Sequence, residues 1–244
     1  MEITDYSYIG VGPIFMRDRN GSGGLVPVGE VSSANFSVEE EVKELPDHTA
    51  AGGGTRNEVR RVKSVNVKLM LHDLSPANLS MVLYGNTTTL EAGSVTAETV
   101  TVALGTLVPL ANIAASSVVV TDVTDVTTYT AGTDYEVRGA GLWIPATSTI
   151  PPGSVHVAYS HPGQDVIEAF TQAASEYEML LDGLNEARSG KANVLRAHRI
   201  RFGAAASVDW IGDDFAGLEI AGKLLADTTQ GAGKSRFYKA TIVQ

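Results

Sequence analysis

The residues that could carry out chemistry are few in this chain, and their spacing matches no familiar site. Cys is absent from the 244 residues, which excludes thiolate metal sites, cysteine nucleophiles and disulfides. The 5 histidines stand at no metal-ligand spacing, and neither His-Glu-x-x-His nor an Asp-rich calcium loop occurs. These histidines are His48, His72, His156, His161 and His198. We expect each to be an ordinary surface or partly buried side chain.

Two short patterns imitate a reactive site. Gly233-Lys234-Ser235 is half of a phosphate-binding loop, but Thr228 stands where that motif needs its first glycine. We therefore expect a glycine-rich hairpin turn there. Asp213 and Asp214 are adjacent, so on a strand they would face opposite sides rather than form an acid/base pair. We therefore expect no catalytic residue, metal or cofactor, and we do not expect this protein to be an enzyme.

The charge balance limits the partners. The chain has 18 Lys and Arg against 28 Asp and Glu, a formal net charge of −10. Such an acidic chain is not expected to grip nucleic acid by its phosphates, although DNA could still pass it without binding. No apolar stretch reaches the ~18 residues of a membrane helix. The segment Met1 to Gly10 holds Glu2 and Asp5 and lacks a basic region, so we expect no secretory signal.

The elements that must position any site fall into a core and an insertion. Between Gly85 and Asp165 there are seven acidic residues, one Arg and no Lys, in a Thr- and Val-rich background. Short apolar runs there are separated by Gly and Pro, which indicates short strands in a small sandwich. We therefore expect a discontinuous β core over 1–85 and 166–244, and an inserted acidic β segment over 86–165.

Both flanks of the insertion have the period of strands. Ser64 to Leu71 alternates strictly, with Val65, Val67, Leu69 and Leu71 on one face. Similar alternation over 34–42 and 176–181 predicts further half-buried strands. One short helix is expected after Ser75, a good N-cap, with Pro76 at its first position and Gly85 as its C-terminal cap. The fold class is mainly β: two packed antiparallel sheets with one short flanking helix and an inserted β-rich segment.

The segment from Lys43 to Arg61 differs from its neighbours. It contains Pro46, Asp47, a triple glycine and mixed charges. It offers little apolar surface to a core, so we expect a long mobile loop. Long loops inside compact domains are usually functional or disordered.

The order of several short motifs resembles the tail tube (major tail) proteins of long-tailed, non-contractile bacteriophages. The resemblance covers both flanks, and the inserted segment is similar to an inserted β region of some members. The motifs are Gly-Val-Gly-Pro-Ile at 10–14, Pro-Val-Gly-Glu-Val at 27–31, Lys-Glu-Leu-Pro-Asp at 43–47, Asp-Leu-Ser-Pro-Ala-Asn-Leu at 73–79, Asp-Gly-Leu-Asn at 182–185, Asp-Asp-Phe at 213–215 and Lys-Leu-Leu-Ala-Asp at 223–227.

The resemblance implies a structural virion protein that forms hexameric rings. The rings stack into a tail tube, through which DNA passes during ejection without specific binding. The partners implied are the chain itself, the tape-measure protein and the tail-tip and terminator proteins, with no membrane. The implied location is the virion tail, after assembly in the host cytoplasm.

Two groups of residues are candidates for roles in such a tube. Acidic side chains on one parity of two strands could line the channel and repel DNA. They are Glu39, Glu41, Glu176 and Glu178. The glycine-rich segment could order when the next ring arrives. Its candidate residues for ring stacking are Pro46, Asp47, Gly52, Gly53, Gly54 and Arg56.

Other classes of protein remain open at this point. A tube protein of the bacterial type VI secretion class would also stack hexamers. A β-sandwich adhesion or carbohydrate-binding module would need an exposed aromatic cluster, whereas aromatic residues are only 7% of the chain, with Trp143 and Trp210 far apart in sequence.

Overall fold

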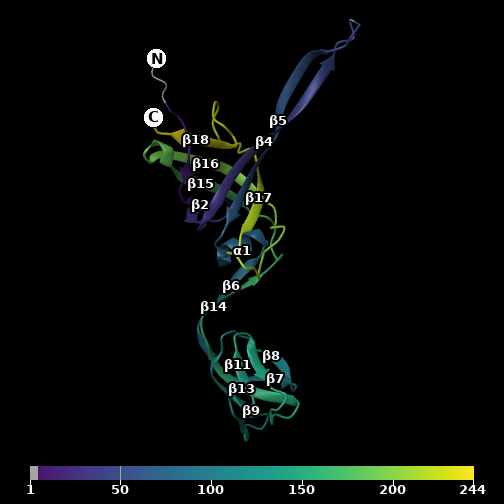
Figure 1. Cartoon of the computed structure of the whole chain (residues 1–244), viewed down its shortest axis with the longest axis vertical. Coiled ribbons are helices and arrows are strands. Elements are labelled where there is room, and N and C mark those ends of the chain that lie inside the picture. Colours follow the sequence, from purple (N-terminus) through teal and green to yellow (C-terminus); the bar gives the residue numbers. More distant parts are fainter. Residues whose placement is uncertain (1–4, 50) are drawn as a thin grey trace. The chain divides into compact units, whose positions relative to one another are not determined.

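The computed structural model describes residues 5–49 and 51–244 and is built mainly of antiparallel β-strands (Figure 1). The chain divides into two compact units, one of Met1–Asn86 with Ile167–Gln244 and one of Thr87–Val166. These boundaries lie one residue further along the chain than the expected ones. The expected fold class is confirmed: several antiparallel sheets, one α-helix and an inserted β-rich segment. Over the described ranges, no helix has the length and apolar character needed to cross a membrane.

The larger unit is organised by one nine-stranded sheet. Its central path runs β3-β2-β15-β16-β17-β5-β4, while β1 pairs with β15 and β18 pairs with β16. The strands are β1 (Gly10–Val11), β2 (Ile14–Asp18), β3 (Val26–Pro27), β4 (Val31–Pro46), β5 (Thr55–Leu71), β15 (Glu176–Asn185), β16 (Lys191–Phe202), β17 (Leu218–Leu224) and β18 (Tyr238–Ile242). A 3-10 helix, η1 (Glu186–Arg188), joins β15 to β16.

This sheet folds over and encloses one apolar core. Ile14 and Met16 of β2 share the core with Leu69 and Leu71 of β5, although the two strands lie far apart in the strand order. At the open edge, the Phe36 ring of β4 lies 5.3 Å from the Tyr238 ring of β18. The packed layers of this unit are therefore two parts of one folded sheet. The alternation predicted over 64–71 is confirmed, because all four apolar residues of that strand are buried.

The helix α1 (Pro76–Val82) closes one end of this core. The Ser75 hydroxyl accepts a hydrogen bond from the Asn78 N–H (3.2 Å), so the expected N-cap is confirmed. The predicted C-terminal cap is shifted, since the residue with positive φ is Tyr84 (47°) rather than Gly85. The Gly85 N–H bonds the Ser80 carbonyl, and a side chain at Gly85 would lie 2.9 Å from the Glu168 carbonyl oxygen. Glycine is required there by close packing.

The predicted long mobile loop is wrong for most of its length. β4 continues to Pro46 and β5 begins at Thr55, so only 47–54 connect them. A ladder pairs Glu40–Leu45 with Asn57–Val62, and its backbone hydrogen bonds need no apolar core. Alternating charged and β-branched residues suit an exposed ladder. The sequence indicates a loop because this segment offers little apolar surface to a core, but pairing in a ladder is enough to form the two strands.

Among the described residues, the end of this hairpin pairs with no other strand of the sheet. β17 pairs with β5 only over Val65–Leu71, so the rest of β5 pairs with β4 alone. Figure 1 shows the two strands running together beyond their neighbours. We call residues 39–62 the projecting ribbon.

The smaller unit has its own core between two sheets. A four-stranded sheet has the order β10-β9-β13-β7, and a three-stranded sheet has the order β11-β12-β8. Their strands are β7 (Gly93–Val102), β8 (Thr106–Pro109), β9 (Ser116–Asp122), β10 (Thr128–Tyr129), β11 (Glu136–Arg138), β12 (Gly141–Ile144) and β13 (Gly153–His161). Buried residues of both sheets, such as Val157 and Leu142, form one cluster. The two crossings between the units form a further pair of strands, β6 (Asn86–Leu90) and β14 (Gln164–Glu168).

Candidate functional site

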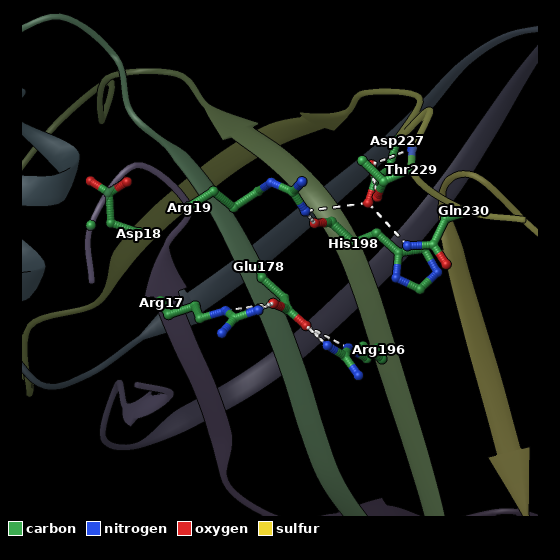
Figure 2. Close-up of a pocket in the computed structure, with 10 residues that line it drawn as sticks. Arg17, Asp18, Arg19, Glu178, Arg196, His198, Asp227, Thr229 and Gln230 are labelled. Carbon is green, nitrogen blue, oxygen red and sulfur yellow. Dashed lines mark hydrogen bonds and ion pairs between the residues drawn. The ribbon is translucent and has the colours of Figure 1, made fainter. Parts of the chain in front are cut away.

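The most elaborate polar site of the larger unit surrounds Glu178 on the outer face of the sheet. It is a hollow of about 370 Å³ formed by β2, β15, β16 and the turn after β17 (Figure 2). Glu178 is only 2% exposed. One carboxylate oxygen accepts a hydrogen bond from Arg17 Nε (2.6 Å), and the other accepts from Arg196 Nε. The carboxylate is thus shared between two guanidinium groups from the two neighbouring strands.

Glu176, on the same strand, repeats this arrangement. Arg199 donates to both of its oxygens, from Nε (2.6 Å) and Nη2 (2.8 Å), and Arg201 donates from Nη2 (2.6 Å). The hydrogen bond from Arg199, with its charge and that of Arg201, holds the pKa of Glu176 below its usual range. Four arginines therefore form ion pairs with two glutamates, and the formal net charge of these six side chains is +2.

This finding corrects the expected acidic face at Glu176 and Glu178. The two glutamates do share one face of their strand, but neither presents a bare carboxylate. Glu178 is buried, and the side chain of Glu176 is 14% exposed. The physical reason is that a buried carboxylate requires partners, and guanidinium groups provide paired hydrogen bonds to it. The locally exposed charge is carried by the arginines.

A β-bulge explains why these arginines were not connected to the glutamates from sequence. Strict alternation would place Arg196 on the opposite face of β16 from Arg199 and Arg201. In the structure, Tyr177 pairs with Ile200 and Met179 pairs with Ala197, so two residues of β16 stand opposite Glu178. The extra residue resets the alternation. The sequence signal is the spacing of Arg196 and Arg199 by three within a strand.

The rest of the hollow is an ordered turn rather than an acid/base pair. Asp227 accepts hydrogen bonds from the Gln230 amide (3.0 Å) and from the Thr229 hydroxyl (2.8 Å), and it lies 3.3 Å from Arg19 Nη1. These bonds, that of Gln230 first, hold the pKa of Asp227 far below its usual range. Burial, and then the charge of Arg196, lowers the pKa of His198.

This arrangement favours a structural role for the hollow. All three carboxylates are engaged in hydrogen bonds, and the pKa values of Glu176, Asp227 and His198 are lowered by their surroundings. The side chains of Arg17 and Arg196 remain 43% and 44% exposed. Within the described chain, no group of His, Asp or Glu residues is suited to hold a metal ion.

The second pair of candidate channel residues lies elsewhere. Glu39 and Glu41 belong to the projecting ribbon, on the edge strand β4, which β5, β17 and β16 separate from β15. Both side chains are more than half exposed and lie 3.6 Å from a lysine, Lys63 for Glu39 and Lys43 for Glu41. The four glutamates predicted to line one channel are thus two separate pairs with different surroundings.

The six candidate stacking residues lie together at the tip of the ribbon. Pro46 ends β4, and Arg56 lies on β5. Asp47 orders the turn by accepting hydrogen bonds from the Thr49 N–H (2.8 Å) and hydroxyl (2.6 Å), which lower its pKa. The three glycines, Gly52, Gly53 and Gly54, have φ of 114°, 70° and 137°, with open space around each. The tip is a short turn built for glycine.

The ribbon and the residue before it also expose apolar side chains that the loop interpretation overlooked. Five of them are between 42% and 54% exposed, unlike the fully buried residues of β5 in the core. They are Val38, which directly precedes the ribbon, and Val42, Leu45, Val59 and Val62. An exposed two-stranded ribbon is at most marginally stable by itself. Here its ladder continues that of the sheet, and exposed ion pairs between Glu39 and Lys63 and between Glu40 and Arg60 join its strands.

Comparison with known proteins places the chain in a family without assigning a role. A family model described as "Protein of unknown function UCP028589" matches residues 7–241. Because this match spans both flanks and the insertion, the chain belongs to that family. A search of curated proteins found no match.

Proposed function

We propose that this member of the family is a structural virion protein that self-assembles into stacked hexameric rings, the tail tube of a long-tailed, non-contractile bacteriophage. The resemblance described from the sequence supplies the hexamer, the stacking and the passage of DNA. The mainly β fold agrees with that class of protein. In this proposal the chain has no catalytic role, and its main partner is itself.

The projecting ribbon is the observation that carries the proposal. It holds half-exposed apolar side chains on a ladder that, among the described residues of the larger unit, pairs with no further strand. Exposed ladders and apolar edges are liabilities in a monomer, and native proteins normally cover or blunt them. A second copy of the chain would cover the ribbon in a ring stack. Over Glu39–Pro46 the ribbon reaches about 26 Å at ~3.3 Å per residue.

The charge of the outer sheet face affects how DNA would be accommodated. The Glu176 and Glu178 clusters carry a net charge of +2. A channel wall with excess arginine would hold DNA through release of counterions. We therefore assign this face to contacts away from the DNA path. Glu39 and Glu41 stay the candidates for the channel, because they lie before the stacking tip of the ribbon and are more than half exposed, although each lies 3.6 Å from a lysine.

The separate core of the smaller unit favours a second candidate for that unit alone. A β-sandwich that folds around its own cluster could serve as a surface-binding module on the outside of a particle. Such a role is compatible with a tube formed by the larger unit. A glycan array with the purified chain would test it.

Negative-stain electron microscopy of the concentrated, purified chain tests the proposed function. Rings or hollow tubes are the expected result, with a sedimentation coefficient that rises with concentration. A chain that stays monomeric at every concentration and salt condition, with an intact β spectrum by circular dichroism, would overturn the proposal.

A further inference from the structure

The loop between β16 and β17 carries the most exposed apolar residues of the larger unit. Over 203–217 the chain forms no helix or strand. Trp210 is 71% exposed, and Ile211 and Phe215 are each 97% exposed. Three large apolar side chains within six residues form a surface that monomeric proteins rarely leave uncovered.

The same loop is acidic. Asp209, Asp213 and Asp214 stand between and beside the apolar residues. Across the described residues, no ion pair includes any of the three. The loop is held at its ends, where the Ala205 N–H bonds the Val82 carbonyl (2.9 Å) and Gly217 packs near Met70. It therefore presents apolar side chains together with unpaired negative charge on a fixed base.

A groove of complementary character lies on the outer face of the same sheet. It has a volume of about 460 Å³ and runs over β16, β17 and β5. The small side chain of Ala221 leaves a hollow between longer neighbours. The floor of the groove is formed by the Ala221 side chain and by the main chain at Val67 and Gly222, since the Val67 side chain itself is buried in the core, and its rim includes Lys68, Arg201 and Lys223.

The rim is positively charged but unevenly neutralised. Lys68 pairs with Glu219 (2.7 Å) and Arg201 pairs with Glu176 (2.6 Å). For Lys223, the described residues provide no ion pair. The groove thus offers an apolar floor beside one free ammonium group and two shared cations.

We infer that the loop 203–217 of one copy docks in this groove of a second copy. The apolar triad meets the apolar floor, and the aspartates meet Lys223 and the other rim cations. The exposure of Trp210, Ile211 and Phe215 shows that the loop does not fill the groove of its own chain. We take the contact to be head-to-tail, in which case repetition closes a ring or extends a filament, whereas a reciprocal exchange between two copies would stop at a dimer.

This inference deepens the proposed function and rests on it for the closed ring, since it names the contact between neighbours within one ring. It is distinct from the projecting ribbon, which would join one ring to the next. Loss of the loop contact should therefore prevent even the smallest oligomer, whereas loss of the ribbon contact should leave single rings.

The test uses two variants of the full chain that damage opposite halves of the contact. Phe215→Ser removes an anchor from the loop, and Ala221→Glu fills the groove with a negative charge. Each alone should weaken self-association at least about 30-fold, the size expected for loss of a central anchor. Mixed in equal amounts, the two should form one-to-one pairs and nothing larger, because each variant retains the half that the other lacks.

Sedimentation velocity over a concentration series reads out these species, and melting curves confirm that each variant is folded. Val126→Ser, which removes another exposed apolar side chain, is the matched control and should assemble like the wild type. If Ala221→Glu does not fold, Lys223→Glu replaces it, with Lys234→Glu as its control.

The outcomes separate this inference from the proposed function. Variants that assemble like the wild type, or a mixture that yields no pairs, would overturn the docking contact while the tube proposal stands. A wild type that never self-associates would overturn both. Weakened single variants that form pairs only when mixed would support the contact.

Discussion

The two halves of the β4–β5 hairpin share one ladder but have opposite surroundings. From Ser64 to Leu71, alternate side chains of β5 enter the core, and Leu69 is fully buried. From Thr55 to Lys63 the same strand is exposed on both faces. The half over 64–71 is a strand because it packs on the core, whereas the half over 55–63 is a strand because it continues the ladder with β4. A segment retained without a local packing benefit is a candidate for a contact with another molecule.

The largest expected effect on stability comes from a substitution in the packed half of the hairpin, whereas one in the exposed half should have little effect. Leu69→Ala should lower the free energy of unfolding by about 2–5 kcal/mol, since it opens a cavity in a fully buried position. Leu45→Ala on the ribbon should change it by less than about 0.5 kcal/mol. Urea unfolding of the two variants measures the difference. Equal effects would mean that the ribbon is packed in the monomer.

Substitution of one glutamate from each pair compares the stability contributions of a buried and an exposed carboxylate. Glu178→Ala should cost about 3 kcal/mol, because it leaves two arginines without the carboxylate that they share in a buried site. This is the low end of the range for a broken buried pair, since both guanidinium groups are partly solvated. Glu39→Ala should cost less than about 0.5 kcal/mol, as an exposed ion pair contributes little. Similar losses of stability in both variants would show that the carboxylate of Glu178, shared by Arg17 and Arg196, does not stabilise the fold.

In the larger unit, the main pH effect on stability should come from the sheet and the turn after β17; the exposed carboxyls of the ribbon, such as Asp47, also have lowered pKa values but should contribute little. Hydrogen bonds, chiefly those of Gln230 to Asp227 and of Arg199 to Glu176, lower the pKa values of both carboxyls. Their contribution to stability is therefore complete above the unfolded pKa of about 4 and is lost as the pH falls through the folded values. Melting temperatures at pH 7, 4 and 3 should decline, and Asp227→Asn should flatten the decline. An unchanged slope in that variant would remove Asp227 from this account.

The smallest effect on stability is expected at the tip of the ribbon. Replacement of 47–54 by Asn-Gly would join Pro46 to Thr55 by a two-residue turn suited to a hairpin. The tip offers open space around its glycines and, among its described residues, no buried side chain, so the melting temperature should stay within a few degrees of the wild type. Stacking of rings in electron micrographs should be lost. Normal tubes from this variant would show that the tip is passive.

The sequence predicted those features that depend on local pattern. Strict alternation identified the buried face of β5, and Ser75-Pro76 identified the start of the helix. Acidic, Thr-rich composition located the inserted unit to within a residue. Each of these signals is carried by adjacent residues and needs no knowledge of the fold.

The features that sequence reasoning missed depend on non-local pairing. The sequence predicts a loop for the ribbon because its two strands pack on no core and are held by pairing with each other. The arginine partners of Glu176 and Glu178 were missed because a bulge in β16 moves Arg196 onto the face of Arg199. Parity arguments assume an unbroken ladder, so a single extra residue reverses their conclusion.

The central claim is that the projecting ribbon is covered by another copy of the chain. The absence of Cys from the sequence allows a direct measurement with a single introduced thiol. Val59→Cys places that thiol on the ribbon, and Val126→Cys places it on the smaller unit as a control; both positions are exposed. The account predicts that thiol labelling of Val59→Cys slows strongly as the protein is concentrated, while labelling of Val126→Cys does not. Equal labelling of the ribbon thiol in dilute and concentrated protein would contradict it.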